Sequence, residues 1–547
     1  MMLAAGALAL ISMACSSDGG SSRGTGTDDD SITDVTVESD HHADPGEMPT
    51  GTGTEDVEPG NAAAPGSAGP GSSTAPGSTG PGSSTAPGST GPGSSTGPTS
   101  RTAPEPVCDA DRDASRDADV AASVTVWHSL GGDQTFEVFD ALVDDFHVAH
   151  PNIEVTTLQV EGYSSALRLL RDTDPADFPD LFMASVDTAR LLAESGAFVP
   201  PSACWGVEPP VLGDLLPVIR ATLTVDDVLW AYPFNISTPV LIYDPTLLDD
   251  AGIADPTPPA TPAELGELVA AIAAAGEAPG GLALYDRSGS WLIEQWAVHH
   301  GHTLVEPANG VAGHPIDGIR LATDEAVEAL EWARGLYDQG LVSWVSDNQS
   351  GLDDLLKLID LADRAAFTMH TSAAIGDLVW LVYETGIDDL EGAELGVAPL
   401  PSPSGEAATL VGGGSLWLLD NADPVATSAA THFAAFLMAP SSQATFAAAT
   451  GYVPATVAAA AHPVTVARWQ EFPQFAVAHR QLAEQGATPS EIGMQIGPRV
   501  QVQRVLENAA KDVIVNGCDA REALEAAERD ALDIVRQYEL GAPDGER

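Results

Sequence analysis

Basic residues are what this sequence most lacks. It has 22 Lys and Arg residues against 79 Asp and Glu residues, so its formal net charge is −57 over 547 residues. A field of this sign repels the phosphate groups of nucleic acids, which excludes a nucleic-acid partner. The excess of acid favours a well-solvated surface, but it does not identify a ligand.

Cysteine is also scarce. The chain has four, namely Cys15, Cys108, Cys204 and Cys518. In an exported protein the last three can form one disulfide, with one thiol left over, and the sequence does not decide which pair forms.

The apolar run at the start of the chain, Leu3–Met13, is too short to cross a bilayer as a helix. Its length suits a signal peptide, and it leads into Ser12-Met13-Ala14-Cys15, which is typical of a lipoprotein cleavage site. We therefore predict a lipoprotein signal peptide at residues 1–15. Lipidation of Cys15 would anchor the protein to the outer face of the cell membrane. The alternative is an ordinary cleaved signal peptide with an incidental cysteine.

Residues 16–120 are rich in Gly, Ser, Thr, Pro and Asp, and they contain an eleven-residue repeat that starts at Ala64, Ala75 and Ala86. A segment of this composition has too little apolar surface to offset the entropy of ordering it. We predict a disordered tether, with an O-glycosylated stalk as the alternative.

The remaining chain, about 425 residues from Ala121 onward, is too long for one ordinary core, so two lobes are expected. Strand-like segments at Ser123–Trp127, Ile153–Leu158 and Asp180–Met183 alternate with amphipathic helical segments. This alternation predicts a parallel α/β sheet. Later helices are predicted at Leu265–Ala275, Asp324–Gln339, Asp353–Leu361, Thr427–Met438 and Arg521–Leu540, the first behind a capping box formed by Thr261 and Glu264.

One segment, Tyr232–Ile253, combines the sequence patterns of a loop, a strand and a helix. It reads as a polar loop at Asn235–Thr238, a strand at Val240–Tyr243, and a short helix at Pro245–Ala251 closed by Gly252. A loop that leads into a buried strand can present hydroxyl and backbone groups to a small ligand.

Motifs for catalysis and metal binding are weak. The cluster His299-His300-Gly301-His302 resembles a metal site, but adjacent side chains point in different directions and no carboxylate or cysteine nearby completes a set. The run Gly412-Gly413-Gly414-Ser415 lacks the lysine of a phosphate-binding loop. No spacing singles out a carboxylate pair for glycoside hydrolysis. We predict no metal, no cofactor and no catalytic residue.

Four separated segments resemble one protein family. They are Trp127-His128-Ser129, Pro233–Leu241, Gly412–Trp417 and Thr450–Pro454. In this order they are similar to the extracellular solute-binding proteins of carbohydrate ABC importers, most of all to the branch that binds glycerol-3-phosphate. The resemblance implies an α/β, two-lobed, periplasmic-binding-protein-like (type II) fold with hinge strands and an interlobe ligand cleft.

The resemblance also implies the organisation and partners of the protein. Lobe 1 is expected at residues 121–236 and 388–440, and lobe 2 at residues 237–387 and 441–547. A monomer would capture a sugar, polyol or glycerol-phosphate-type ligand by lobe closure and deliver it to an ABC importer permease. The competing hypotheses are a secreted carbohydrate-active enzyme on a flexible stalk and a stalked adhesin without a small ligand.

Nine positions are implied as ligand contacts: Tyr163, Ser185, Ser237, Trp291, Ser372, Gly413, Gly414, Tyr452 and Gln503. Two of them depart from the family pattern. Ser185 stands where an acidic contact is expected, and Gln503 stands where an arginine faces phosphate, with Arg499 and Arg504 beside it. A phosphate prefers charge-assisted donors, so a neutral sugar or polyol becomes at least as good a hypothesis. Trp291 could instead have a purely structural role in core packing. Gly413 and Gly414 could instead form a tight turn.

Overall fold

The computed structural model describes Val107, Cys108, Ser115 and residues 120–541, apart from gaps at 254–256, 277–280, 314, 346–354, 356–357, 359–364, 385–393, 406–407 and 422. The predicted signal peptide, Cys15, nearly all of the predicted tether and most of the predicted helix Asp353–Leu361 lie outside the described residues. Within the described ranges, no helix combines the length and the apolar character needed to cross a membrane.

The first lobe begins with alternating strands and helices, as predicted. They are β1 (Ala122–His128), α2 (Asp133–Ala149), β2 (Ile153–Gln159), α3 (Tyr163–Asp172), β3 (Leu181–Ser185), α4 (Ala189–Glu194) and β4 (Phe198–Val199). β1 pairs in parallel with β2 and β3. The later strand β15 (Gly412–Leu419) enters this sheet antiparallel to β3 and β4. The sheet is therefore mixed, and the prediction of a parallel sheet is confirmed only for its first three strands.

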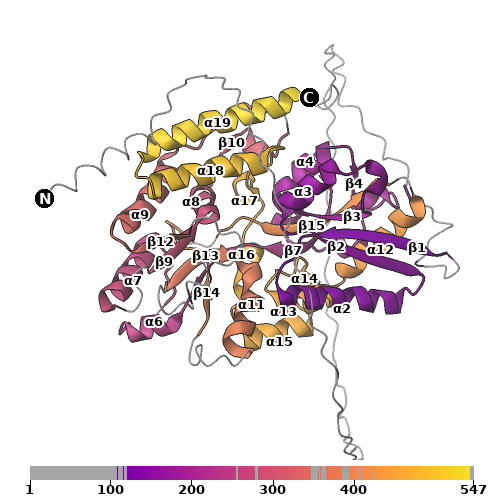
Figure 1. Ribbon diagram of the computed structural model, residues 1–547, viewed down its shortest axis with the longest axis horizontal. Coiled ribbons are helices and arrows are strands. Elements are labelled where there is room, and N and C mark those ends of the chain that lie inside the picture. Colours follow the sequence, from indigo (N-terminus) through magenta and orange to yellow (C-terminus); the bar gives the residue numbers. More distant parts are fainter. Residues whose placement is uncertain are drawn as a thin grey trace, which may run out of the picture. The chain divides into compact units, whose positions relative to one another are not determined.

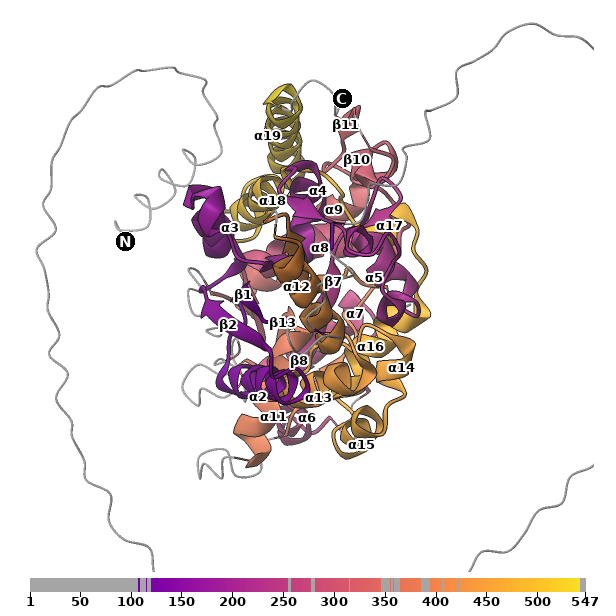
Figure 2. The ribbon, with the colours of Figure 1, turned by 90° about the vertical axis from the view of Figure 1, so that its right-hand side faces the viewer.

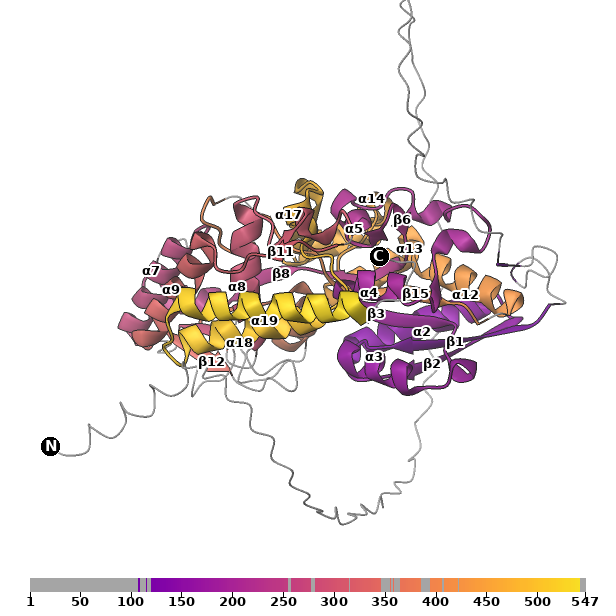
Figure 3. The same cartoon turned by 90° about the horizontal axis from the view of Figure 1, so that it is seen from above.

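The second sheet has the strand order β12-β9-β13-β8-β14. Its strands are β8 (Pro239–Tyr243), β9 (Leu282–Tyr285), β12 (Val342–Val345), β13 (Phe367–Thr371) and β14 (Gly396–Ala398). The helices of this half are α6 (Pro245–Asp250), α7 (Pro262–Ala275), α8 (Asp286–His299), α9 (Asp324–Asp338), α17 (Pro489–Ile492), α18 (Arg499–Ile514) and α19 (Ala520–Gly541). The predicted capping box of Thr261 and Glu264 is present at the start of α7. Figures 1 and 3 show α18 and α19 side by side along this half.

The chain crosses between the two sheets at adjacent strands. β7 (Tyr232–Ser237) pairs with β15 in the first sheet, β8 pairs with β13 in the second, and only Thr238 lies between β7 and β8. The prediction of a polar loop at Asn235–Thr238 is wrong, because the backbone of residues 235–237 pairs with β15. The following strand and the helix before Gly252 are confirmed.

Two hydrophobic cores fill the two halves. The first contains Phe139, Val143 and Phe146, which lie three or four residues apart on one face of α2. The second contains Leu524, Ala527, Ala531 and Val535 from α19. Three helices pack into the first core although the predicted boundaries place them in lobe 2: α13 (Pro440–Thr450), α15 (Pro463–Glu471) and α16 (Phe475–Glu484). The short helix α14 (Val457–Ala460) contacts α13 and α15. Figure 2 shows α13 beside α2. The exact lobe boundaries stay a prediction.

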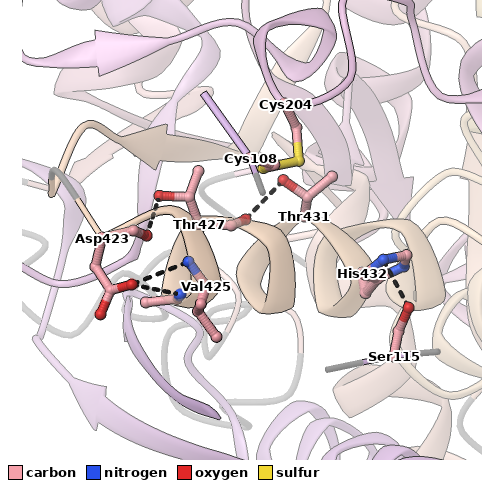
Figure 4. The surroundings of a disulfide bond; sticks show 9 residues. Cys108, Ser115, Cys204, Asp423, Val425, Thr427, Thr431 and His432 are labelled. Carbon is pink, nitrogen blue, oxygen red and sulfur yellow. Dashed lines mark hydrogen bonds between the residues drawn. A yellow bond between two sulfur atoms is a disulfide. The ribbon is translucent and has the colours of Figure 1, made fainter. Parts of the chain in front are cut away.

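A disulfide joins Cys108 to Cys204, 96 residues later in the sequence. Figure 4 shows it near α12 (Pro424–Leu437), where the imidazole of His432 also hydrogen-bonds the hydroxyl of Ser115 at 2.8 Å. These contacts hold the start of the folded region against the first lobe. The pair that the sequence left open among Cys108, Cys204 and Cys518 is thus Cys108–Cys204.

Candidate ligand-binding cleft

A cavity of about 250 Å³ lies where the chain crosses between the two sheets. Most of the predicted contacts line it, and they come from both halves of the molecule: Tyr163, Ser185, Ser237, Trp291, Gly413, Tyr452 and Gln503. Ser372 and Gly414 do not line it. Segments far apart in the sequence thus converge on one space of a size suited to a small ligand.

The glycines of β15 form part of the cavity wall because two strands approach closely there. Gly413 has φ +81° and pairs with Ile236 of β7, and a Cβ on it would come within 2.2 Å of the carbonyl oxygen of Asn235. A larger residue therefore cannot occupy this position without moving the strand. A Cβ on Gly414 would meet the hydroxyl of Tyr163 at 2.6 Å. Gly414 thus leaves room for a cavity residue without reaching the cavity itself.

Two tyrosines face the cavity from the first half. Tyr163 is the first residue of α3, and its hydroxyl accepts a hydrogen bond of 2.7 Å from the side-chain amide of Asn235. Tyr452 stacks on Phe446 with 5.4 Å between ring centroids. Burial raises the pKa of both Tyr163 and Tyr452. Both hydroxyls therefore stay protonated at neutral pH and can donate a hydrogen bond to a ligand.

An aromatic pair faces the cavity from the second half. Trp291 on α8 meets Tyr285 edge to face, with 6.0 Å between ring centroids and an interplanar angle of 87°. Both residues line the cavity. Sequence reasoning identified Trp291 and missed Tyr285, which ends β9 and precedes α8. Such rings can pack against the apolar face of a sugar or polyol.

Ser372 lies behind the cavity wall. Its hydroxyl accepts a hydrogen bond of 3.3 Å from the backbone N–H of Thr238, and its own N–H donates to the carbonyl oxygen of Thr238 at 2.9 Å. The side chain is fully buried. Its neighbours Thr371 and Ala373 are the residues that reach the cavity. Ser372 therefore ties the end of β13 to the crossing between the sheets.

Charged side chains that sequence reasoning did not select also line the cavity: Asp187, Arg287, Glu294 and Arg499. Asp187 follows Ser185 by two residues, and the hydroxyl of Ser185 donates to its carboxylate at 3.3 Å. An acidic side chain thus lines the cavity two residues after Ser185, where the sequence pattern led us to expect one.

An arginine lines the cavity one helical turn before Gln503, where the sequence pattern led us to expect one. Arg499 is the first residue of α18, and residues four apart share one helix face. This four-residue spacing could have identified Arg499 as a residue on the same face as Gln503. Gln503 itself donates from its amide to the hydroxyl of Ser290 at 3.4 Å.

The four charges form one connected cluster across the cleft. Arg499 forms a buried ion pair with Glu294 and lies 3.8 Å from a carboxylate oxygen of Asp187. Arg287 lies 3.9 Å from Asp187 and 3.4 Å from Glu507. Burial raises the pKa of Glu294, and the charge of Arg499 opposes this rise. Asp187 thus connects the first half to two guanidinium groups of the second.

The histidine cluster lies at the C-terminal end of α8. Burial lowers the pKa of His299 to about 4, with the neighbouring His300 adding to the effect. In the part of the chain that the structure describes, no three His, Cys, Asp or Glu side chains gather around a possible metal position.

Two α/β halves joined by crossing strands, with a polar cleft at the crossing, define a bilobal solute-binding protein. Residues 141–475 match the model of the bacterial extracellular solute-binding protein family, and the chain belongs to this family. It is therefore a binding protein and not an enzyme, and the resemblance found in the sequence is confirmed.

Curated relatives and solved structures agree with this assignment. The sn-glycerol-3-phosphate-binding periplasmic protein UgpB of Yersinia enterocolitica is 25% identical over 456 residues, which cover 78% of this chain and 95% of that protein. The structure of UgpB from Mycobacterium tuberculosis in complex with glycerophosphocholine has a TM-score of 0.63 at 17% identity and covers 76% of this chain and 99% of its own. The GacH receptor of Streptomyces glaucescens, solved unliganded and with acarbose, has a TM-score of 0.61 at 18% identity, with the same coverage. The predicted two-lobed fold is thus confirmed.

Proposed function

We propose that this chain is the substrate-binding lipoprotein of an ABC importer. It captures a sugar, polyol or glycerol-phosphate-type ligand by closing its lobes, and it delivers that ligand to a membrane permease. One observation carries the proposal: the cavity is lined from both halves, with Tyr163 and Ser185 on one side and Trp291 and Gln503 on the other. A ligand that contacts both halves binds the closed arrangement better than the open one, which shifts the population toward closure.

The ligand class is supported by the relatives and by the lining residues. One relative is named for binding sn-glycerol-3-phosphate, and two structural neighbours were solved with glycerophosphocholine and acarbose. All three ligands carry at least two hydroxyl groups. Tyr163, Ser185, Ser237 and Gln503 offer neutral donors and acceptors, and Trp291 offers an apolar ring.

The test is ligand binding by the mature chain. We expect a neutral sugar, a polyol, glycerol-3-phosphate or its choline diester to raise the melting temperature without being consumed, and to lower the radius of gyration in solution scattering. Turnover of any of these compounds would favour the enzyme hypothesis. A broad panel without a melting shift would favour the adhesin.

A matched pair of tryptophan variants locates the site. Trp291→Ala should weaken binding by about tenfold or more, because a ring that packs on the ligand contributes roughly 1.5–3 kcal/mol. Trp380→Ala is the control, since Trp380 is 39% exposed and lies outside the cavity lining. Equal effects of the two variants would contradict the proposed site.

The lipid anchor at Cys15 is part of the proposal and has its own test. Two acyl chains suffice for stable membrane attachment. Mass spectrometry of the membrane-bound protein from a bacterial host should find acyl groups on Cys15, and Cys15→Ser should release the protein into the medium. A Cys15–Cys518 disulfide in the mature protein would contradict the anchor, because the same sulfur cannot carry a lipid.

A further inference from the structure

The charges that line the cavity are balanced. Two guanidinium groups, Arg287 and Arg499, face two carboxylates, Asp187 and Glu294. Both arginines already lie within 4 Å of a carboxylate: Arg499 contacts Glu294 and Asp187, and Arg287 contacts Asp187 and Glu507. The guanidinium groups are thus neutralised before any ligand arrives.

The carboxylates of this cluster would repel an anionic ligand and weaken its binding. A phosphate group at Arg499 would lie close to Glu294 and Asp187, which hold the same guanidinium. Two like charges 4 Å apart repel each other by about 4 kcal/mol at an effective dielectric constant of 20. A neutral ligand escapes this repulsion.

The buried ion pair also leaves one donor and one acceptor unused. Among the described residues, Nη1 of Arg499 and Oε2 of Glu294 are buried without a hydrogen-bond partner, although both side chains line the cavity. A buried polar atom without a partner costs roughly 1–3 kcal/mol. A ligand hydroxyl can accept from Nη1 and donate to Oε2 at once, whereas a phosphate dianion can only accept. The pair therefore matches a hydroxyl group better than a phosphate.

We infer that this cleft selects neutral polyhydroxylated ligands, a sugar or a polyol, over phosphorylated ones. Arg499, held between Glu294 and Asp187, sets the preference and binds a ligand hydroxyl. The inference rests on the proposed function and narrows its ligand class. It also separates this chain from relatives that are named for glycerol-3-phosphate.

Calorimetric titration of the mature chain with matched pairs tests the preference. The pairs are glucose and glucose-6-phosphate, maltose and maltose-1-phosphate, and glycerol and sn-glycerol-3-phosphate. The neutral member should bind at least about tenfold more tightly in any pair that binds, which is a modest share of the expected repulsion. Tighter binding of the phosphorylated member would overturn the inference and leave the proposed function standing. Failure of every pair to bind would overturn both.

Charge-removing variants test the role of the cluster. Asp187→Asn and Glu294→Gln each remove one carboxylate from Arg499, so each should raise the affinity for the phosphorylated member relative to its neutral partner by about tenfold. Glu294 is buried and its variant risks misfolding, whereas the side chain of Asp187 is 25% exposed. Glu208→Gln is the matched control, because Glu208 pairs with Arg220 outside the cavity lining. An unchanged affinity ratio in folded Asp187→Asn would overturn the assignment to this cluster.

Discussion

Two buried arginines in this protein differ in one decisive respect. Arg190 on α4 and Arg499 on α18 are 2% and 4% exposed. Each nitrogen of the Arg190 guanidinium has a partner: Nε donates to Gln495 O at 3.0 Å, Nη1 to Glu194 at 2.9 Å, and Nη2 to Gly310 O at 3.1 Å. Arg499 instead keeps Nη1 without a partner and lines the cavity.

The difference separates a structural role from a ligand-directed one. Gly310 lies between β10 (Val305–Glu306) and β11 (Gly318–Ile319), so Arg190 fastens α4 of the first half to a hairpin of the second. The bonds of Arg190 are complete without any ligand. Those of Arg499 are not, and incomplete hydrogen bonding at a cavity wall is a reason to expect a ligand there.

The largest expected effect concerns Arg190. Arg190→Gln removes a buried charge from its partners, so the free energy of unfolding should fall by about 3 kcal/mol or more. Urea denaturation measures this fall, and the ligand affinity of the folded protein should change by less than about twofold. Arg220→Gln is the control, because the Arg220–Glu208 pair is about one third exposed and such pairs contribute about 0–1 kcal/mol. Equal losses in the two variants would contradict the structural role of Arg190.

At Arg499 we expect a small change in the free energy of unfolding and a large change in ligand affinity. The double variant Arg499→Gln with Glu294→Gln removes both buried charges together, so the free energy of unfolding should change by about 1 kcal/mol. Affinity for a neutral sugar or polyol should fall by about tenfold to a hundredfold, since a hydrogen bond to a charged group contributes roughly 1.5–3 kcal/mol. Calorimetry and denaturation together measure both quantities. Unchanged affinity would place the ligand away from Arg499.

Local patterns in the sequence predicted most of the fold. The capping box at Thr261 and the apolar face of α2 are encoded within a few neighbouring residues, and both are present. The polar segment Asn235–Thr238 was misread because its strand character comes from pairing with β15, which lies far along the chain. No local signal reports such pairing.

The sequence predicted only part of the site, because many of its contacts join residues far apart in the chain. Ser237, Gly413 and Tyr452 belong to segments that resemble the family, and all three line the cavity. Glu294 and Asp187 matter through their contacts with Arg499, and those contacts exist only in the folded chain. Arg499 could have been predicted as a cavity residue, because it stands four residues before Gln503 on the same helix face.

The smallest expected effect is the pH dependence that Glu294 contributes through its place in the Arg499 cluster. Burial raises the pKa of Glu294 above its ordinary value of 4.5, so the folded state binds this proton more tightly than the unfolded state does. Between 4.5 and the raised pKa, the free energy of unfolding should therefore fall as pH rises, by up to about 1.4 kcal/mol per pH unit. Glu294→Gln carries no such proton and should lack this part of the slope, whereas Arg190→Gln should keep it.

Denaturation across pH 4.5–8 measures the slopes of the wild type and of both variants. A wild-type slope equal to that of Glu294→Gln would mean that Arg499 keeps the carboxylate charged throughout, and the pH dependence would then not distinguish the two buried arginines.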